Sequence, residues 1–207
     1  MNTSVRSVAS VRSVTSRVGY GVRTALTAGL AATLLAACGT GAKDAATTPD
    51  GWSTLTTDRL TVAHPADFKQ LAAGDLPEGD AAGAVQRKDG SPVGAIYVEF
   101  DYGTGINDVD MAGTAAQARI QLGATPVDTT DIEVATAKGD TAEARRIDWT
   151  STSTGDDGQP PKGTPLAGVM VTGLDTKDRP FLITVNAEQG LLSDQQIKDI
   201  IASVSLK

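Results

Sequence analysis

The chain contains a single cysteine, Cys38, which stands directly after an uncharged apolar stretch, residues 24–37. With one cysteine no intramolecular disulfide can form, and a cysteine-rich metal site is excluded. Whatever folds in this chain must therefore be held together by a hydrophobic core. Because aromatic residues make up only 4% of the sequence, that core has to be built from Val, Ile, Leu and Ala side chains.

The beginning of the chain has the features of a secretory leader. Residues 1–23 contain four arginines and no acidic residue, and residues 24–37 carry no charge. As a helix, residues 24–37 would extend about 21 Å, which is short for a bilayer whose hydrocarbon core is about 30 Å thick. A basic start, a short apolar stretch and small residues at its end are typical of a signal peptide, which we assign to residues 1–37.

The end of this stretch, Leu35-Ala36-Ala37-Cys38, resembles the lipobox of bacterial lipoproteins, which has a leucine, two small residues and an invariant cysteine. The small side chains would let the backbone enter a peptidase cleft, and the thiol is the nucleophile that takes up a diacylglyceryl group. The resemblance implies cleavage before Cys38 and a lipid, with palmitate or a similar acyl chain, on its sulfur. Whether the new amino group is also acylated stays open. We therefore expect a lipoprotein anchored on the extracytoplasmic face of a bacterial cell membrane.

Two other interpretations of this segment are a plain secretory signal that happens to contain a cysteine and an uncleaved anchor helix. The first is disfavoured because the only cysteine occupies the one position that the lipobox demands. The second is disfavoured by the short apolar length. The richness in Ala, Gly, Thr and Asp favours a high-GC organism such as an actinomycete.

The part of the chain after residue 37 is strongly acidic. It carries 14 basic and 25 acidic residues, a net charge near −11. Phosphate backbones would repel such a body, so we expect no nucleic acid as a partner. Anionic headgroups would repel it too, so attachment to the membrane has to come from the lipid on Cys38.

Residues 38–51 are small and polar and show no apolar periodicity, which is typical of a flexible tether. A chain of this length and composition has an end-to-end distance of about 20 Å. After the tether we expect one folded domain, residues 52–207, without an internal repeat or a further boundary.

The folded part alternates apolar and polar residues in short runs separated by turn residues, which predicts antiparallel hairpins. The clearest turn signal is Asp89-Gly90. The strands that we expect are residues 52–56, 60–63, 82–87, 93–101, 131–137, 141–151, 168–174 and 180–186.

Three helices are predicted. A short one covers residues 65–73, and a second is capped by Asn107 or Asp108 and runs to residue 122. A stripe of small residues on the second helix should pack close to a sheet. The third follows a capping-box pattern at residues 193–196. Its apolar face consists of Ile197, Ile200, Ile201 and Val204.

Hairpins and helices in this order predict an α+β fold, with an antiparallel β-sheet flanked by helices in an α/β/α sandwich. The residues Trp52, Leu60-Thr61-Val62 running into Pro65, and 200–204 at the end of the last helix carry a further resemblance. They are similar to the family of small domains typified by the photosystem II protein PsbP, the Ran-binding protein Mog1 and bacterial lipoproteins of the LpqN type. The pattern covers nearly the whole mature chain, but a fold does not determine a function.

The single histidine, His64, could act as a base or a ligand, although a half-exposed loop histidine is the simpler interpretation. A Ser–His–Asp triad would have to use it, and no G-x-S-x-G motif occurs in the sequence. We therefore predict no catalytic residue, no metal and no cofactor.

Acidic residues cluster at Asp101, Asp108 and Asp110, and again at Asp156 and Asp157. Either group could bind Ca²⁺ through oxygen ligands, but neither has the spacing of a known calcium loop. Capping of a helix accounts for Asp108, and solvation accounts for the others.

Arg145 and Arg146 are adjacent in a predicted strand, so their side chains should point to opposite faces. We expect one ordinary ion pair there rather than a basic patch. Trp149 and Tyr97 could line a groove for a ligand, but core packing is the simpler role for both.

The lipobox, without any recognisable catalytic constellation beside it, predicts a non-enzymatic lipoprotein that binds an unidentified protein or small ligand. Two alternatives stay open, a hydrolase that acts on envelope material through carboxylates and a structural spacer. Two carboxyl groups about 5–10 Å apart across a cleft would favour the hydrolase. A shallow apolar groove would favour the binding module.

Overall fold

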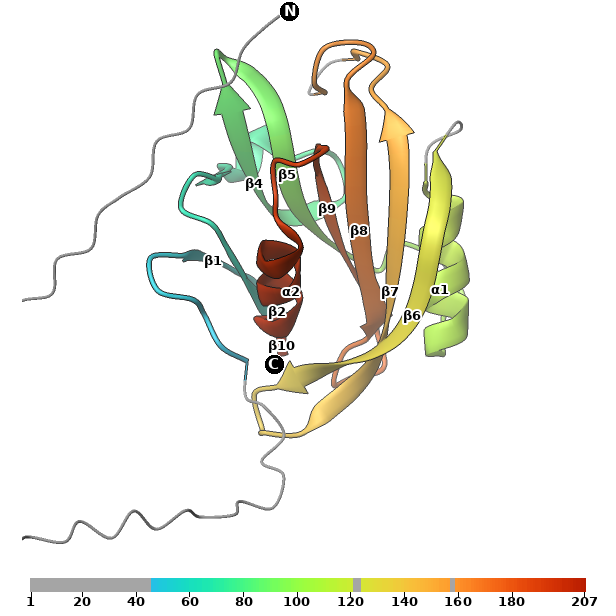
Figure 1. Ribbon diagram of the computed structural model, residues 1–207. Coiled ribbons are helices and arrows are strands. Elements are labelled where there is room, and N and C mark those ends of the chain that lie inside the picture. The colour runs from blue at the N-terminus through green and yellow to red at the C-terminus, as the bar shows by residue number, and fades with distance from the viewer. Residues whose placement is uncertain (1–45, 121–123, 157–158) are drawn as a thin grey trace, which may run out of the picture. The chain divides into compact units, whose positions relative to one another are not determined.

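The computed structural model of the chain describes residues 46–120, 124–156 and 159–207 (Figure 1). The predicted signal peptide, the lipobox and residues 38–45 of the predicted tether lie outside these residues. The described residues form ten strands and two α-helices. In chain order they are β1 (Ser53–Thr56), β2 (Leu60–His64), β3 (Lys69–Gln70), β4 (Asp80–Lys88), β5 (Ser91–Phe100), α1 (Val109–Ala118), β6 (Thr125–Thr136), β7 (Thr141–Thr152), β8 (Pro165–Leu174), β9 (Pro180–Glu188), α2 (Asp194–Ala202) and β10 (Ser205–Leu206).

All ten described strands belong to one sheet, in the order β1-β2-β10-β6-β7-β8-β9-β5-β4-β3. Neighbouring strands are antiparallel, except that β10 runs parallel to β6. Long strands twist and coil, and this sheet curves so far that β1 contacts β4 near the opposite edge (Figure 1). The sheet is thus nearly closed around its own concave face.

The predicted fold class, α+β with an α/β/α sandwich, is therefore wrong. The described residues are mostly strand, and their two α-helices, of ten and nine residues, are too short to cover a ten-stranded sheet as layers. The sheet instead buries its apolar face by curving around it, with α2 on the concave side and α1 on the outer side. Alternating strands cannot distinguish a flat sheet from a curved one, because both have a side-chain period of two.

The predicted helix at residues 65–73 is also wrong. The N–H of Phe68 donates to Pro65 O at 3.0 Å, and the chain then forms β3 along the edge of β4. Phe68 is 2% exposed and packs into the concave core, whereas both residues of β3 are exposed. A turn followed by an edge strand buries the aromatic ring, and this burial outweighs a weak helical propensity.

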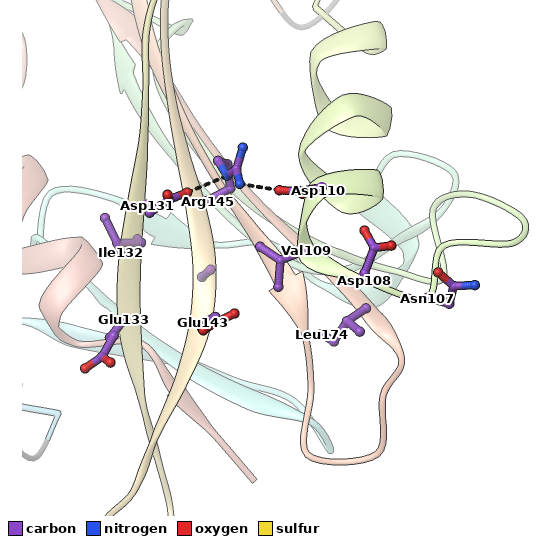
Figure 2. A pocket seen from close by; sticks show the side chains of 11 residues that line it. Asn107, Asp108, Val109, Asp110, Asp131, Ile132, Glu133, Glu143, Arg145 and Leu174 are labelled. Atoms are coloured by element: carbon purple, nitrogen blue, oxygen red, sulfur yellow. Dashed lines mark hydrogen bonds and ion pairs between the residues drawn. The ribbon is translucent and has the colours of Figure 1, made fainter.

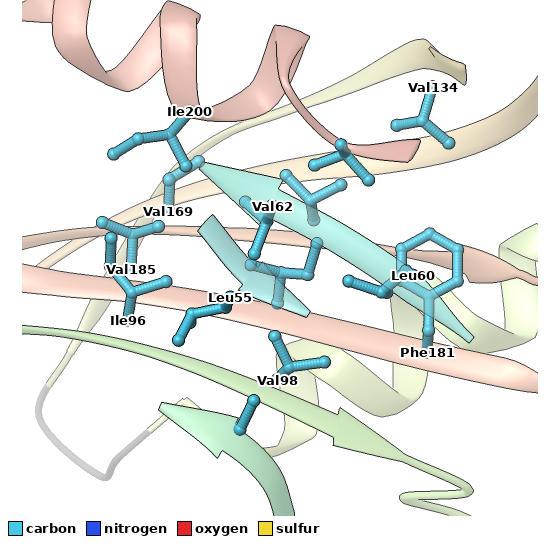
Figure 3. Close-up of a cluster of buried hydrophobic side chains, with 14 of the residues drawn as sticks. Leu55, Leu60, Val62, Ile96, Val98, Val134, Val169, Phe181, Val185 and Ile200 are labelled. Carbon is cyan, nitrogen blue, oxygen red and sulfur yellow. The ribbon is translucent and has the colours of Figure 1, made fainter. Parts of the chain in front are cut away.

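The concave core joins both ends of the sheet (Figure 3). Leu55 of β1 and Val62 of β2 belong to the same buried cluster as Ile96 of β5, Val169 of β8 and Ile200 of α2. Ile200 is 1% exposed, so the apolar face predicted for the last helix is confirmed at this residue. The core consequently depends on the curvature that brings β1 and β2 over the central strands.

Both helices begin at residues that the sequence predicted as N-caps. The Ser193 hydroxyl accepts a hydrogen bond from the N–H of Gln196 at 3.2 Å, and the Gln196 side chain accepts one from the N–H of Ser193 at 3.0 Å. The capping box of α2 is therefore confirmed. At α1 the Asp108 carboxylate accepts from the N–H of Met111 at 2.7 Å. This helix ends at Ala118, so the predicted extension to residue 122 is wrong: Arg119 is the C-cap, and Ile120 lies beyond the helix.

The turn predicted at Asp89-Gly90 is confirmed between β4 and β5. The φ angles are 52° at Asp89 and 83° at Gly90, and Lys88 pairs with Ser91 across the turn. Two positive φ angles in a two-residue loop are those of a type I′ turn, whose twist matches that of the strands.

Gly168 of β8 lies against the ring of Trp149, its partner on β7. A Cβ atom on Gly168 would stand 2.2 Å from Cε2 of Trp149, far inside van der Waals contact. Trp149 is 8% exposed and belongs to the outer core under α1, so core packing, the simpler of the roles considered for it, is confirmed.

We expect Gly168→Ala to lower the free energy of unfolding by about 2–3 kcal/mol, because the methyl group overpacks the contact with Trp149. The matched control is Gly74→Ala, where a Cβ atom would meet nothing within 4 Å and the change should stay within about 0.5 kcal/mol. Urea unfolding followed by circular dichroism measures both. Equal stability of the two variants would contradict the close contact.

Candidate functional site

A groove of about 790 Å³ lies between the beginning of α1 and the β6–β7 hairpin (Figure 2). Its walls carry five carboxylates and one guanidinium. We call it the acidic groove. Its lining residues are Asn107, Asp108, Val109, Asp110, Asp131, Ile132, Glu133, Glu143, Ala144, Arg145 and Leu174.

The register of β6 and β7 places charged residues of the groove on one face of the hairpin. Asp131 lies opposite Arg145, and Glu133 lies opposite Glu143. Because side chains alternate between the two faces along a strand, these four residues share a face. The cap and the first turn of α1 supply the other two carboxylates.

Arg145 holds two of the carboxylates by ion pairs (Figure 2). One amino group of its guanidinium pairs with Asp110 of α1, and its Nε lies 2.8 Å from Asp131 Oδ1. The second contact is an ion pair that lacks the alignment of a hydrogen bond. Both carboxylates are 83% exposed, against 25% for the arginine side chain. Exposed pairs of this kind contribute little to stability, so these carboxylates stay available to a ligand.

Gly113 of α1 explains how the arginine reaches this position. A Cβ atom on Gly113 would stand 3.2 Å from Cγ of Arg145, so the aliphatic part of the arginine packs against the bare helix backbone. Glycine inside a helix costs about 1 kcal/mol relative to alanine. That cost is offset by the close approach of α1 to β7.

Glu133 and Glu143 are direct cross-strand neighbours with the same charge. Glu133 accepts a hydrogen bond from the Thr141 hydroxyl at 3.0 Å. No ion pair among the described residues includes either glutamate. Like charges directly opposite each other on one face destabilise a sheet. A cationic group bound between them would relieve this repulsion.

Within the described ranges, no group of three or more His, Cys, Asp and Glu residues is placed to hold a metal ion. In the same ranges no helix has the length and apolar character needed to cross a membrane.

His64 is not the half-exposed loop residue that the sequence suggested. It ends β2 with 1% exposure, and its ring lies near that of Phe68. Its Nδ1 is 3.0 Å from Pro65 O, and its Nε2 has no partner among the described residues. Burial lowers the pKa of the imidazole, so the ring is neutral near pH 7. The histidine is part of the core and not of the groove.

The carboxylates that cluster in the sequence separate in the structure. Asp101 pairs with Arg59 at 3.0 Å and does not line the groove, whereas Asp108 and Asp110 both line it. Asp156 accepts from the Thr154 hydroxyl at 2.6 Å. Asp157 lies outside the described residues. Among the described residues, the first predicted cluster therefore does not form the oxygen cage that Ca²⁺ requires.

Arg146 points away from Arg145, as the alternation predicted. It donates two hydrogen bonds of 2.7 Å to Asp148 on its own strand. Arg145 adds two ion pairs on the other face, so the single pair expected from the sequence is an undercount. Tyr97 is half-buried and packs closely over Gly83 of β4, where a Cβ atom would stand 2.7 Å from its ring.

Asp80, Glu99 and Arg119 form a second group of charges, which the sequence alone did not indicate. Asp80 and Glu99 are partners across β4 and β5, and Arg119 pairs with Glu99 at 2.6 Å. Burial, with a further contribution from Glu99, raises the pKa of Asp80 to about 6. Burial also raises the pKa of Glu99, against the effect of Arg119. The register of β4 and β5 and the position of the end of α1 bring these residues together, so no local sequence pattern predicts them.

The sequence matches no protein-family model and no curated protein. The Ran-binding protein Mog1p of Saccharomyces cerevisiae is similar in structure, with a TM-score of 0.45 and 10% identity over 74% of this chain and 94% of that one. A protein of Bacteroides thetaiotaomicron has a TM-score of 0.40 and 11% identity over 72% of this chain and 45% of that one. For a protein of unknown function from Pseudomonas aeruginosa the values are 0.32 and 12%, over 67% and 83%. These are similarities of fold alone, and none of them assigns a function.

We expect Asp80→Asn to raise the free energy of unfolding by about 2 kcal/mol at pH 7.5 and to change it little at pH 4. The folded chain holds the Asp80 proton up to a pH of about 6, whereas the unfolded chain loses it near 3.8. The contribution of Asp80 to stability is therefore complete below pH 4 and lost as the pH rises through 6. Urea unfolding of the variant and its parent between pH 4 and 8 gives the difference. A difference independent of pH would contradict the raised pKa.

Proposed function

We propose that the chain is a lipoprotein, held by a lipid on Cys38 to the extracytoplasmic face of a bacterial cell membrane, whose folded domain binds a cationic partner in the acidic groove. The domain acts as a binding module and not as an enzyme. The observation that carries the proposal is the excess of carboxylates in one open groove, five against a single guanidinium.

The charges of the groove favour a cation in two ways. Three of the five carboxylates have no ion pair among the described residues, namely Asp108, Glu133 and Glu143. The acidic body around them adds a field that draws cations toward the surface and raises the rate of encounter. Both effects weaken as salt shortens the range of the field, to about 10 Å at 0.1 M.

Of the two functions considered, binding of a cationic partner and hydrolysis, hydrolysis has the weaker support. Asp80 has the raised pKa of a general acid, but Arg119 pairs with its neighbour Glu99. A structural spacer would need neither the groove nor its charges.

The lipid anchor rests on the sequence of the leader. Leu35, Ala36, Ala37 and Cys38 place the only thiol of the chain at the border between an apolar segment and a polar tether. One acyl chain binds a membrane only marginally, while two give stable attachment at about 0.8 kcal/mol per buried CH₂. The acidic body contributes nothing to this attachment, so the lipid has to carry it.

We expect Cys38→Ser to release the protein from the membrane fraction into the medium, because the variant has no thiol to acylate. The control is Ala45→Ser, which introduces the same residue into the tether and should leave the protein membrane-bound. Fractionation of cells and mass spectrometry of the mature N-terminus check both. A membrane-bound Cys38→Ser protein would show that the anchor is not a lipid on this sulfur.

We expect Glu133→Gln and Glu143→Gln each to weaken binding of a lysine-rich octapeptide by about 3- to 10-fold, because each removes one uncompensated carboxylate from the groove. Calorimetric titration at 50 and 200 mM salt measures the affinity and its salt dependence. The matched control is Glu78→Gln, an exposed glutamate outside the groove, which changes the net charge by the same amount. An equal loss in the control would mean that net charge, and not the groove, binds the peptide.

A further inference from the structure

β6 is paired along its whole length on one side only. Ten of its twelve residues pair with β7 in the ladder, from Thr125 to Ala135. On the opposite side β10 is two residues long and pairs with Ala135 and Thr136 alone. Among the described strands, none pairs with residues 125–134 on this outer side. Figure 1 shows β6 as the yellow strand in front of α1.

The hydrogen bonds at the end of β6 tell which residues present their backbone to the open side. The N–H of Thr136 donates to Asp140 O at 2.8 Å, toward β7, and the N–H of Ala137 donates to Leu206 O at 2.7 Å, toward β10. Successive residues of a strand direct their backbone groups to opposite sides. Even-numbered residues of β6 therefore bond β7, and the odd-numbered residues 129, 131 and 133 face outward.

These outward residues are exposed. Thr129, Asp131 and Glu133 all belong to the exposed part of the surface. The N–H of Thr129 is satisfied locally, because the carboxylate of Asp128 accepts it at 2.8 Å. The N–H and C=O groups of Asp131 and Glu133 face an edge at which no described strand pairs with them. An open edge of this kind is a template for another strand.

The side chains of the same residues belong to the acidic groove. Asp131 and Glu133 line it from β6, and Glu143 lines it from β7 on the same face. A strand added at the outer edge of β6 would turn every second side chain toward this face. Positively charged residues at those alternate positions would therefore lie beside carboxylates while their backbone completes the ladder.

We propose that the cationic partner binds by β-strand addition: an extended segment with Lys or Arg at alternate positions pairs with the outer edge of β6 at residues 129–133. The proposal rests on the proposed function and adds the mode of recognition to it. Main-chain hydrogen bonds supply affinity in this mode, and alternate side chains supply specificity.

Charge disfavours two other segments that could pair with the β6 edge, a second copy of this chain and the predicted tether. A second copy of this chain, paired antiparallel through β6, would place Asp131 opposite itself and Glu133 close to further acids, which is unfavourable. The predicted tether, residues 38–51, contains one lysine, Lys43, followed directly by Asp44. It therefore lacks the alternating cations that the groove would select.

Amide hydrogen exchange tests the mode of binding directly. The probe is an octapeptide of alternating Lys and Val, added to the full-length chain in detergent. We expect the N–H groups of Asp131 and Glu133 to exchange fast in the free protein and to become protected by about tenfold or more with the peptide. The N–H groups of residues 130 and 132 bond β7 already and should change little. Protection of all four, or of none, at saturating peptide would overturn strand addition.

Two matched comparisons separate this inference from the proposed function. The first comparison uses two peptides of the same charge, one N-methylated at its odd-numbered residues and the other at its even-numbered residues. The peptide whose methyl groups face β6 should bind about tenfold more weakly, because it cannot donate hydrogen bonds to the β6 edge. Glu133→Pro should weaken binding beyond Glu133→Gln, because both remove the charge and only proline removes the N–H. Circular dichroism verifies that the proline variant is folded, and the methylated peptides need no variant.

The outcomes differ for the two proposals. Binding that depends on Glu133 and Glu143 but is equal for both methylated phases would leave the cation-binding groove intact and overturn strand addition. Binding that ignores both glutamates would overturn the proposed function itself. A dimer of the chain alone, detected by sedimentation and lost in Glu133→Pro, would show that the edge serves self-association, and it would overturn the choice of partner.

Discussion

The buried guanidinium of Arg59 joins three parts of the chain that the closed sheet needs to keep together. Arg59 follows β1 and is 4% exposed. It donates to Asp175 at 2.7 Å, to Asp101 at 3.0 Å and to Pro180 O at 3.0 Å, and it lies 4.2 Å from the centre of the Phe100 ring. A buried charge that loses its partners costs several kcal/mol. The ends of β5, β8 and β9 are thus tied to the β1–β2 turn, and the concave core depends on this tie.

Arg59 and Arg145 differ in how far their ion pairs are exposed to solvent. Around Arg59, burial opposes ionisation of Asp175, but hydrogen bonds from the N–H groups of Arg179 and Lys177, and from Arg59 itself, bring the pKa of this carboxyl below its ordinary value. Around Arg145 both carboxylates are open to solvent and can exchange partners without exposing a buried charge. The first arrangement makes a fixed structural joint, and the second leaves a surface at which a foreign cation can compete.

Local features of the chain were predictable from the sequence, and long-range ones were not. Asp89-Gly90, the cap at Asp108 and the capping box at Ser193 depend on neighbours within four residues, which a single sequence displays. The curvature of the sheet depends on contacts such as Arg59 with Asp175, which are 116 residues apart. The acidic groove was predictable only in part. A turn centred near residue 138 already places Glu133 opposite Glu143, so that half of the acidic site could have been derived from the predicted hairpin.

The unpaired segment of the β6 edge is bounded at both of its ends. Asp128 occupies the N–H of Thr129 next to an irregularity in the ladder, and β10 occupies the edge from Ala135 onward. Between these two stops about five residues remain, a length of roughly 17 Å at 3.4 Å per residue. The length of this open segment therefore limits the length of any strand that can pair with it. An intruding chain can run straight for about five residues and must then bend away, so a continuous stack of strands cannot grow from this side of the molecule.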